Sequence, residues 1–351
     1  MSAGELLAGR PFPLGHGLVL RNRLVGTAHA SGLVSGGLPL PGDAEYWRRL
    51  AADGAAMLVV GGTVTAPEST CRRCPPRRHQ PKEARMLNGK IAIVTGAGQG
   101  LGRGIVCEMA RQHAAGIAVV DRNRQTAEET ATVAKELGSE VLVIECDLRD
   151  RDQIESMVNS AAAHFGGLDV LVNNAGIIET TMTADCAVDT LPEDVWHAVY
   201  EVNLRAPWLA TKFAAPYLRR SDRGPSIVNA CSVGGLVAFP HAPAYCATKG
   251  GIAQLTRATA VDLGPAVRCN AYAPGAVDTP MARRHIEHAK DPVAAGWELT
   301  APQINGRLGT TEEVGKLVCF LASDDAAFLT GAVVPIDGGF LAWGSSRPGP
   351  T

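Results

Sequence analysis

The sequence has 351 residues, of which 46% are hydrophobic and 19% are charged, and its formal net charge is −2. This length is sufficient for one large α/β domain and an additional segment. The balanced charge argues against a nucleic-acid partner, which would favour clustered basic residues. The apolar runs are shorter than the roughly 18 residues that a membrane span needs.

The N-terminus and the cysteines predict a cytoplasmic protein. The first residues, MSAGELLAGRPFPLG, lack the basic and apolar regions of a secretion signal. Several cysteines lie within apolar stretches, where they are expected to be small core residues in a reducing compartment. These are Cys107, Cys146, Cys231, Cys269 and Cys319.

Three zones follow one another along the chain. Residues 1–70 alternate apolar runs with Gly/Pro turns, and residues 71–86 are basic and rich in proline, as expected for a linker. Residues 87–351 alternate short apolar runs with helical patterns. The sequence therefore predicts an N-terminal extension, a linker and one large α/β domain.

The α/β domain begins with a regular alternation of strands and helices. The predicted strands are Ile91–Thr95, Gly116–Asp121, 141–146, 168–172 and Ser226–Ala230. Helices are predicted over 103–113 and 126–137. This order indicates βαβ units and a doubly wound parallel sheet of the Rossmann type, flanked by helices and buried on both faces. Such a sheet binds its ligand beyond the carboxyl ends of its strands.

A glycine-rich segment, residues 95–102 (TGAGQGLG), follows the first strand and begins a helix. Its glycines allow a tight turn and a close approach of the backbone to a pyrophosphate, and the N–H groups of the helix start can bind the anion. A plain turn is the alternative. The strand–turn–helix context favours a dinucleotide site.

The residue that ends the second strand bears on the choice of dinucleotide. Asp121 stands nineteen residues after Gly102. Its carboxylate can accept hydrogen bonds from the ribose hydroxyls and would repel a 2′-phosphate, which favours NAD over NADP. Arg122 and Arg124 could instead pair with a phosphate, or be solvated charges at a helix start.

The motifs of residues 87–351, about three quarters of the chain, resemble those of the short-chain dehydrogenase/reductase family. Residues 95–102 resemble its glycine motif, and Asp147 resembles its acidic residue at the adenine ring. Residues 173–176 (NNAG) and 337–339 (DGG) resemble its motifs at the end of the fourth strand and near the C-terminus.

Four residues resemble the catalytic set of this family. Asn203 resembles its helix asparagine. Ser232 stands thirteen residues before Tyr245, and Lys249 stands four residues after it, which is the spacing of the family's Ser…Tyr-x-x-x-Lys motif.

The resemblance also implies a cofactor-binding set, in which Pro274-Gly275 and Thr279 hold the nicotinamide carboxamide. The whole set is Thr95, Gly96, Gln99, Gly100, Leu101, Gly102, Asp121, Arg122, Asp147, Leu148, Asn174, Ala175, Gly176, Tyr245, Lys249, Pro274, Gly275, Val277 and Thr279. A homo-oligomer, tetramer or dimer, is implied in the same way.

These side chains can exchange a proton with a substrate oxygen. A free tyrosine has a pKa of about 10, and a lysine one helical turn away on the same face favours the phenolate. Tyr245 is therefore expected to take the alcohol proton in oxidation and to return it in reduction, while Ser232 steadies the substrate oxygen. The resemblance adds a bond from Lys249 to the nicotinamide ribose and a water held by Asn203.

Three segments are expected to border the substrate: 177–190, 233–243 and 281–305, the last as a mobile lid. The second, VGGLVAFPHAP, is small and apolar, which favours an uncharged substrate such as an alicyclic or steroid alcohol. The predicted function is an NAD-dependent oxidoreductase that interconverts a secondary alcohol and a ketone. A 3-oxoacyl reductase of the same family and a nucleotide-binding regulator without catalysis are the alternatives.

Residues 11–70 resemble the start of the old yellow enzyme family, FMN-dependent ene-reductases built on a TIM barrel. The matching stretches are residues 13–15 (PLG), 20–25 (LRNRLV), 45–47 (EYW) and 58–63 (LVVGGT). They span about the first two β/α units, which cannot close an eight-stranded barrel, so no FMN is expected. A flavoprotein is the reading that this segment would otherwise favour.

A zinc site is the alternative for the linker, where Cys71 and Cys74 precede His79. One cysteine pair without a second pair is a weak signal, and the adjacent arginines disfavour a cation. No metal is expected.

Overall fold

The computed structural model describes residues 86–287 and 291–343 and, before residue 86, the backbone of short strands. The chain divides into two units, Met1–Ala84 and Arg85–Thr351, which are described separately.

The described strands of the first unit pair two by two. The antiparallel pairs are β1 (Phe12–Gly15) with β2 (Leu18–Leu20) and β4 (Val34–Ser35) with β5 (Leu38–Pro39). The parallel pair is β3 (Val25–Gly26) with β6 (Met57–Leu58). Apart from this backbone, three predictions concern residues outside the described ones. They are the barrel-like fragment of 11–70, the linker before Met86 and the weighed zinc site at Cys71, Cys74 and His79.

The second unit is built on a seven-stranded sheet in the order β13-β12-β11-β10-β7-β8-β9, in which all neighbours are parallel. Its strands are β7 (Ile91–Thr95), β8 (Gly116–Asp121), β9 (Glu140–Glu145), β10 (Val170–Asn173), β11 (Ser226–Ala230), β12 (Arg268–Pro274) and β13 (Val333–Ile336). The strand order reverses between β7 and β10, and ligands of such sheets bind at this switch point.

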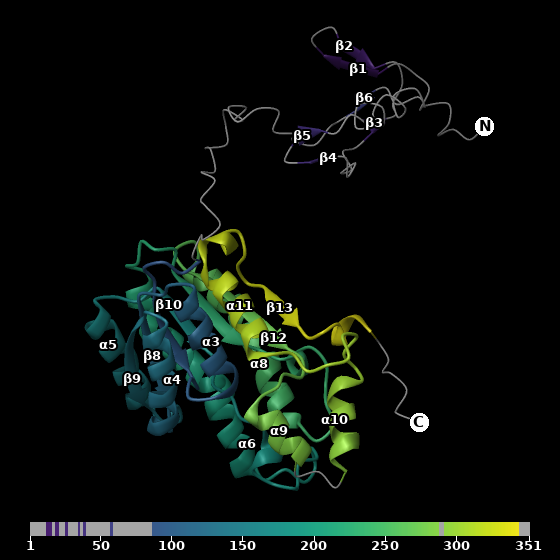
Figure 1. The fold of residues 1–351 in the computed structure, drawn as a ribbon. Helices are drawn as coiled ribbons and strands as arrows, with labels where there is room; N and C mark the ends of the chain where they lie inside the picture. The colour runs from purple at the N-terminus through teal and green to yellow at the C-terminus, as the bar shows by residue number, and fades with distance from the viewer. Residues whose placement is uncertain are drawn as a thin grey trace, which may run out of the picture. The chain divides into compact units, whose positions relative to one another are not determined.

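Helices cover both faces of the sheet (Figure 1). They are α3 (Gly100–Arg111), α4 (Arg124–Glu136), α5 (Arg151–Phe165), α6 (Glu193–Tyr200), α7 (Ala206–Leu218), α8 (Pro243–Leu263), α9 (Pro280–Glu287), α10 (Pro292–Thr300) and α11 (Thr311–Ala322). Short turns η1 (Glu179–Thr181), η3 (Val233–Gly235), η4 (Asp324–Ala326) and η5 (Phe340–Ala342) and the π-helical turn η2 (Glu201–Arg205) complete the domain.

Alternate residues of the strands enter different cores. Val94 and Val119 pack in one cluster with buried side chains of α3, α4 and α11. Ile93 and Val120 pack on the other face with side chains of α5 and α7. The predicted parallel sheet, buried on both faces, is therefore confirmed.

One predicted boundary near the site is wrong. Helix α3 begins at Gly100, not at residue 103, so two glycines of the motif belong to its first turn. Glycine disfavours a helix by about 1 kcal/mol relative to alanine, which conceals the helix start in the sequence.

Within residues 86–287 and 291–343, helices long and apolar enough to cross a bilayer are absent.

Candidate active site

The glycine-rich segment is fixed to the carboxyl ends of two other strands by Asn174. The Asn174 Nδ2 atom donates hydrogen bonds to the carbonyl oxygens of Thr95 (2.8 Å) and Gly96 (3.1 Å). Its Oδ1 atom accepts one from the Tyr272 hydroxyl of β12 at 2.9 Å. The segment after β7 is therefore held against β10 and β12.

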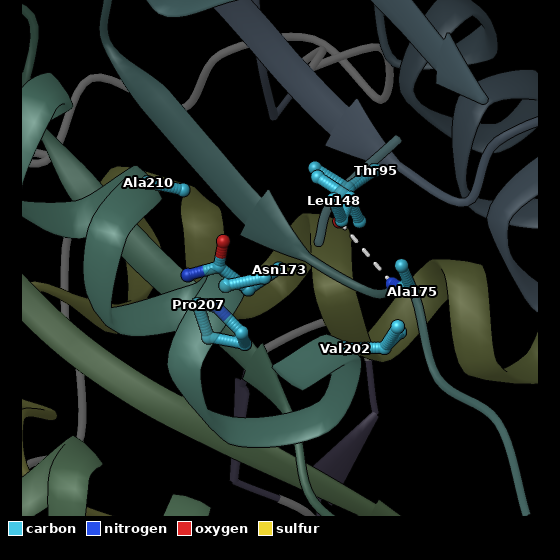
Figure 2. A pocket seen from close by; sticks show the side chains of 8 residues that line it. Thr95, Leu148, Asn173, Ala175, Val202, Pro207 and Ala210 are labelled. Carbon is cyan, nitrogen blue, oxygen red and sulfur yellow. Dashed lines mark hydrogen bonds between the residues drawn. The ribbon is translucent and has the colours of Figure 1, made fainter. Parts of the chain in front are cut away.

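The Thr95 hydroxyl adds two contacts at the same point. It accepts hydrogen bonds from the backbone N–H groups of Asn174 (3.0 Å) and Ala175 (3.2 Å). Figure 2 shows the second bond beside a small hollow, which Leu148 also lines. The loops after β7, β9 and β10 thus meet at the switch point.

Two glycines are required where the segment touches its neighbours. A Cβ atom on Gly96, whose φ is +62°, would lie 2.8 Å from the Ala175 Cα atom. A Cβ atom on Gly102 would overlap the Gly96 carbonyl oxygen and lie 2.6 Å from Asn174 Nδ2. Side chains larger than hydrogen are therefore excluded from both positions.

The start of α3 is suited to an anion. Gln99 is its N-cap residue and makes no side-chain cap hydrogen bond, and its first described turn has no acidic residue. The N–H groups of Gly100, Leu101 and Gly102 belong to this turn, where the helix dipole favours negative charge. These residues fit the pyrophosphate of a dinucleotide.

Asp121 lies where a ribose is expected. Its Oδ2 atom accepts a hydrogen bond from the Gly98 N–H (2.9 Å), and its Oδ1 atom accepts one from the Asn123 N–H (3.0 Å). Arg124 is paired with Glu128 at 2.8 Å. The carboxylate therefore remains next to the glycine segment, while the Arg124 guanidinium has an acidic partner on its own helix.

Asp147 carries a partner that the sequence did not predict. The Arg149 Nη2 atom lies 2.6 Å from its Oδ2 atom, and this bond holds the pKa of the Asp147 carboxyl below its usual range. Arg122 contributes to the same lowering from the loop after β8. At the predicted adenine end, Asp147 is therefore ion-paired within its own loop and is also influenced by the charge of Arg122 from the loop after β8.

The segment after β12 returns to the start of α3. Pro274 ends β12, and the Gly275 N–H donates to the Ile336 carbonyl at 3.1 Å. Val277 forms a parallel bridge with Gly309. Thr279 borders Gly100, since a Cβ atom at that glycine would lie 3.7 Å from the Thr279 Cβ atom. Of the predicted nicotinamide residues, Thr279 thus adjoins the glycine segment.

The DGG motif shapes the turn after β13. The Asp337 carboxylate accepts hydrogen bonds from the N–H groups of Gly339 (3.0 Å) and Leu341 (2.8 Å).

Ser232, Tyr245 and Lys249 converge beyond the end of β11. The hydroxyl groups of Ser232 and Tyr245 share a hydrogen bond. Ser232 also accepts one from the Gly234 N–H at 3.0 Å, which fixes its side chain at the start of η3. The Lys249 Nζ atom lies 5.6 Å from the centre of the Tyr245 ring and donates to the Ala230 carbonyl at 2.8 Å.

Burial dominates the electrostatics of this group. Lys249 is 3% exposed, and desolvation lowers its pKa to about 8. Tyr245 is half-buried as a residue, but its surroundings desolvate the hydroxyl and raise its pKa to about 12, against the lowering effect of the Ser232 bond. Desolvation is therefore the largest influence on the Tyr245 pKa, and it acts in the direction opposite to the one expected of Lys249.

Asn203 lies in the π-helical turn η2, between α6 and α7, and is 1% exposed. Its side chain binds Ile177 twice, donating to the carbonyl oxygen at 2.8 Å and accepting from the N–H at 2.9 Å. It also donates to the Thr248 hydroxyl at 3.3 Å. The Asn203 Oδ1 atom and the Lys249 Nζ atom both border Gly176. All four predicted catalytic residues thus lie around one point.

Groups of three or more His, Cys, Asp or Glu side chains that could hold a metal ion are absent from the described part of the chain.

Comparisons with known proteins agree with this geometry. The family model described as enoyl-(acyl carrier protein) reductase matches residues 96–341. The chain is 36% identical to the 3-oxoacyl-(acyl-carrier-protein) reductase of Thermotoga maritima over 256 residues, which cover 73% of this chain and 99% of that protein. The chain belongs to the short-chain dehydrogenase/reductase family. It is therefore an oxidoreductase that acts on CH–OH groups.

Two further members of the family are similar to this short-chain dehydrogenase/reductase. The cis-4-hydroxycyclohexanecarboxylate dehydrogenase of Sinomonas cyclohexanicum is 35% identical, over 72% of this chain and 97% of that protein. The crystal structure of a short-chain type dehydrogenase/reductase from Mycobacterium marinum is 29% identical, with a TM-score of 0.65, and covers 74% of this chain and 98% of that chain. Since the family model begins at residue 96, the old yellow enzyme resemblance of 11–70 stays a prediction.

The close contact between Gly102 and the Gly96 carbonyl allows the packing of this site to be tested by mutation. In Gly102→Ala, the overlap with the Gly96 carbonyl outweighs the better helix propensity of alanine. We expect the free energy of unfolding, measured in urea, to fall by about 2 kcal/mol. Gly167→Ala is the matched control, because its Cβ atom would meet open space. Equal stability of the two variants would contradict the described contact.

Proposed function

We propose that this protein interconverts a secondary alcohol and a ketone with NAD as the hydride carrier and Tyr245 as the proton donor and acceptor. The observation that carries the proposal is the hydrogen bond between the hydroxyls of Ser232 and Tyr245, beside the buried Lys249 ammonium. Two hydroxyl donors that meet at one point are suited to binding one substrate oxygen.

The cofactor would be held by the sequence-predicted set along the switch point. The start of α3 would bind the pyrophosphate, Asp121 the adenosine ribose, and the segment from Pro274 to Thr279 the nicotinamide end. When bound, NAD supplies a hydride acceptor and a positively charged ring. Asp121 supports NAD over NADP, since its carboxylate accepts a hydrogen bond from the Gly98 N–H of the glycine segment, while Arg124 is paired with Glu128.

Tyr245 would move the proton. In ketone reduction its phenol donates a proton to the carbonyl oxygen, and in alcohol oxidation its phenolate accepts the hydroxyl proton. Ser232 donates a hydrogen bond to the same oxygen in both directions. Lys249 favours the phenolate through its charge, and Asn203 holds Ile177 and the turn before Lys249 in place.

An uncharged substrate is supported by apolar side chains on the three bordering segments. Met182, Leu236, Val237 and Met281 are each 40 to 46% exposed. Such exposed apolar groups favour a ligand that removes them from water. The third segment forms α9 and α10 in the described structure, and its role as a lid belongs to the proposal.

The substrate class can be tested with a panel of alicyclic and steroid alcohols and NAD, with NADH formation as the readout. The similarity to the Thermotoga maritima protein makes a 3-oxoacyl thioester the second candidate, so acetoacetyl-CoA with NADH forms the other arm. Turnover in neither arm by the full chain would refute the proposed function. A flavin absorbance band would instead revive the flavoprotein reading of residues 11–70.

Three broader expectations belong to the same proposal. They are a cytoplasmic location, a homo-oligomer and the division into extension, linker and catalytic domain. Exposed large side chains such as Trp208 and Phe328 support an assembly, because burial between subunits would remove them from water.

Removal of the Tyr245 hydroxyl should separate cofactor binding from catalysis. In Tyr245→Phe we expect NAD affinity to be retained and kcat to fall by at least about a thousandfold, since general acid–base catalysis is lost. Tyr217→Phe removes a hydroxyl that binds Asn159 on the surface and is the matched control. Turnover of the Tyr245 variant within a few-fold of the wild type would exclude the proposed proton transfer.

Loss of the Asp121 carboxylate should reduce the preference of the enzyme for NAD over NADP. We expect the ratio of kcat/KM for NAD to that for NADP to fall by about tenfold or more in Asp121→Ala, because both the ribose acceptor and the repulsion of a 2′-phosphate are removed. Steady-state kinetics with each cofactor measure the ratio, and the exposed Asp152→Ala serves as control. A wild-type enzyme that prefers NADP would overturn the assignment.

The raised pKa of Tyr245 predicts opposite pH dependences for the two directions. Below a pKa of about 12 the phenol predominates, so the base form needed for oxidation increases as the pH rises. We expect kcat for alcohol oxidation to increase from about pH 6 to about pH 9 and kcat for ketone reduction to stay level or decrease. An oxidation rate that declines over this range would argue against Tyr245 as the base.

A further inference from the structure

Glu179 is a buried carboxylate to which the sequence assigned no role. It begins η1, three residues after the NNAG motif, and is 0% exposed. Within residues 86–287 and 291–343 no lysine, arginine or histidine forms an ion pair with it. A buried charge without a countercharge requires compensation by hydrogen bonds.

The compensation comes from the first turn of helix α8. The Glu179 Oε1 atom accepts hydrogen bonds from the backbone N–H groups of Ala244 (2.9 Å) and Tyr245 (3.2 Å). Its Oε2 atom accepts a second bond from the Tyr245 N–H at 3.2 Å. The carboxylate therefore binds the backbone of the residue that carries the reactive phenol.

Helix α8 has no cap of its own at this end. Ala242 is the N-cap residue and makes no side-chain hydrogen bond, and Pro243 at the first helical position has no N–H. The next two N–H groups are those that Glu179 binds. A side chain from a segment more than sixty residues earlier thus replaces the local cap, at the end of the helix where negative charge is favoured.

The same segment is held at its other end by Asn203, through the two bonds to Ile177. Residues 177–179 therefore form a short strut between the π-helical turn η2 and the first turn of α8. Through this strut, the position of Asn203 in η2 is coupled to the position of Tyr245 in α8.

We propose that Glu179 is a positioning residue, which holds the first turn of α8 so that the Tyr245 hydroxyl meets Ser232 and which places a negative charge behind the phenol. This inference rests on the proposed function. The capping of α8 by Glu179 can be tested by a measurement that does not require the enzyme to be active.

The negative charge of Glu179 acts on the pKa of the Tyr245 phenol in a known direction. Glu179 raises the pKa of Tyr245, although less than desolvation does. The other groups that face the phenol are the Ser232 hydroxyl, the thiols of Cys231 and Cys246, the Lys249 ammonium and the Tyr272 phenol. Removal of the negative charge alone should therefore favour the phenolate.

Two substitutions separate the cap from the charge. In Glu179→Gln the amide oxygen can occupy the Oε1 position and accept both N–H groups, so the main part of the cap remains, while the charge and the second Tyr245 bond at Oε2 are lost. In Glu179→Ala both are lost. Glu108→Gln is the matched control, because Glu108 is another buried glutamate (2% exposed) and belongs to α3.

The first readout is hydrogen–deuterium exchange of the peptide 243–249 in the full chain, without substrate. We expect Glu179→Ala to accelerate exchange at this peptide by about tenfold or more, and Glu179→Gln and Glu108→Gln to leave it near the wild-type rate. Unchanged exchange in Glu179→Ala would overturn the proposed cap. This result stands whether or not an alcohol is oxidised.

The second readout is the pH profile of alcohol oxidation. For Glu179→Gln we expect the rising limb to move to lower pH by on the order of 0.5 units, with kcat at the optimum within about twofold of the wild type. For Glu179→Ala we expect kcat to fall by about tenfold with little change in KM for NAD, because the phenol is misplaced.

A Glu179→Gln profile that coincides with that of the wild type, or moves to higher pH, would overturn the role of the charge. If Glu179→Ala does not fold, Glu179→Gln still decides this point. A wild type inactive across the whole panel would refute the proposed function and leave the exchange result intact.

Discussion

The Asn174 side chain holds the carboxyl ends of β7, β10 and β12 together, and the rest of the site depends on this junction. It binds two carbonyl oxygens of the glycine segment and the hydroxyl of Tyr272, while its own N–H binds Thr95. Strands of a parallel sheet are joined along their length by regular hydrogen bonds, but beyond their ends each loop would otherwise be free to move. Because Asn174 satisfies several of these groups at once, the start of α3 has one position relative to β12.

Desolvation is the second constraint on the site. The sheet and α8 enclose Lys249 so fully that its ammonium binds the Ala230 carbonyl within the described structure. The same enclosure raises the pKa of Tyr245 and lowers that of Lys249, so each group is pushed towards its neutral form. A neutral phenol is the acid that a carbonyl oxygen needs, whereas a neighbouring positive charge is needed before the base form becomes common.

The sequence predicted the framework better than the details of the site. The strands β7, β8 and β11 have the predicted bounds, because each is a short apolar run between polar or glycine-containing turns. The start of α3 was placed too late, since glycines do not signal a helix. The motif spacing placed Tyr245 and Lys249 together, because residues four apart on a helix share a face. Ser232 meets them from the start of η3, and its position was implied only by the family resemblance.

The residues that the sequence did not single out act through contacts that no spacing reveals. Glu179 and Arg149 are single charged residues, in the short turn η1 and in the loop after β9, and neither belongs to a periodic pattern. Glu179 meets its partners only because the fold brings segments 65 and 66 positions apart together. The effect of desolvation on the Tyr245 pKa was also not predicted, since the positions of charges can be read from a helix pattern but the loss of water around them cannot.

The bond between the Asp121 carboxylate and the Gly98 N–H links two properties of the enzyme that are often treated as separate. The carboxylate that is proposed to discriminate between dinucleotides also supports the loop that would carry their pyrophosphate. Evolution towards a phosphorylated cofactor would therefore be epistatic in this chain: a neutral residue at position 121 admits the phosphate and at the same time releases the loop. A second substitution that restores an acceptor for the Gly98 N–H would have to come first or arise together with it.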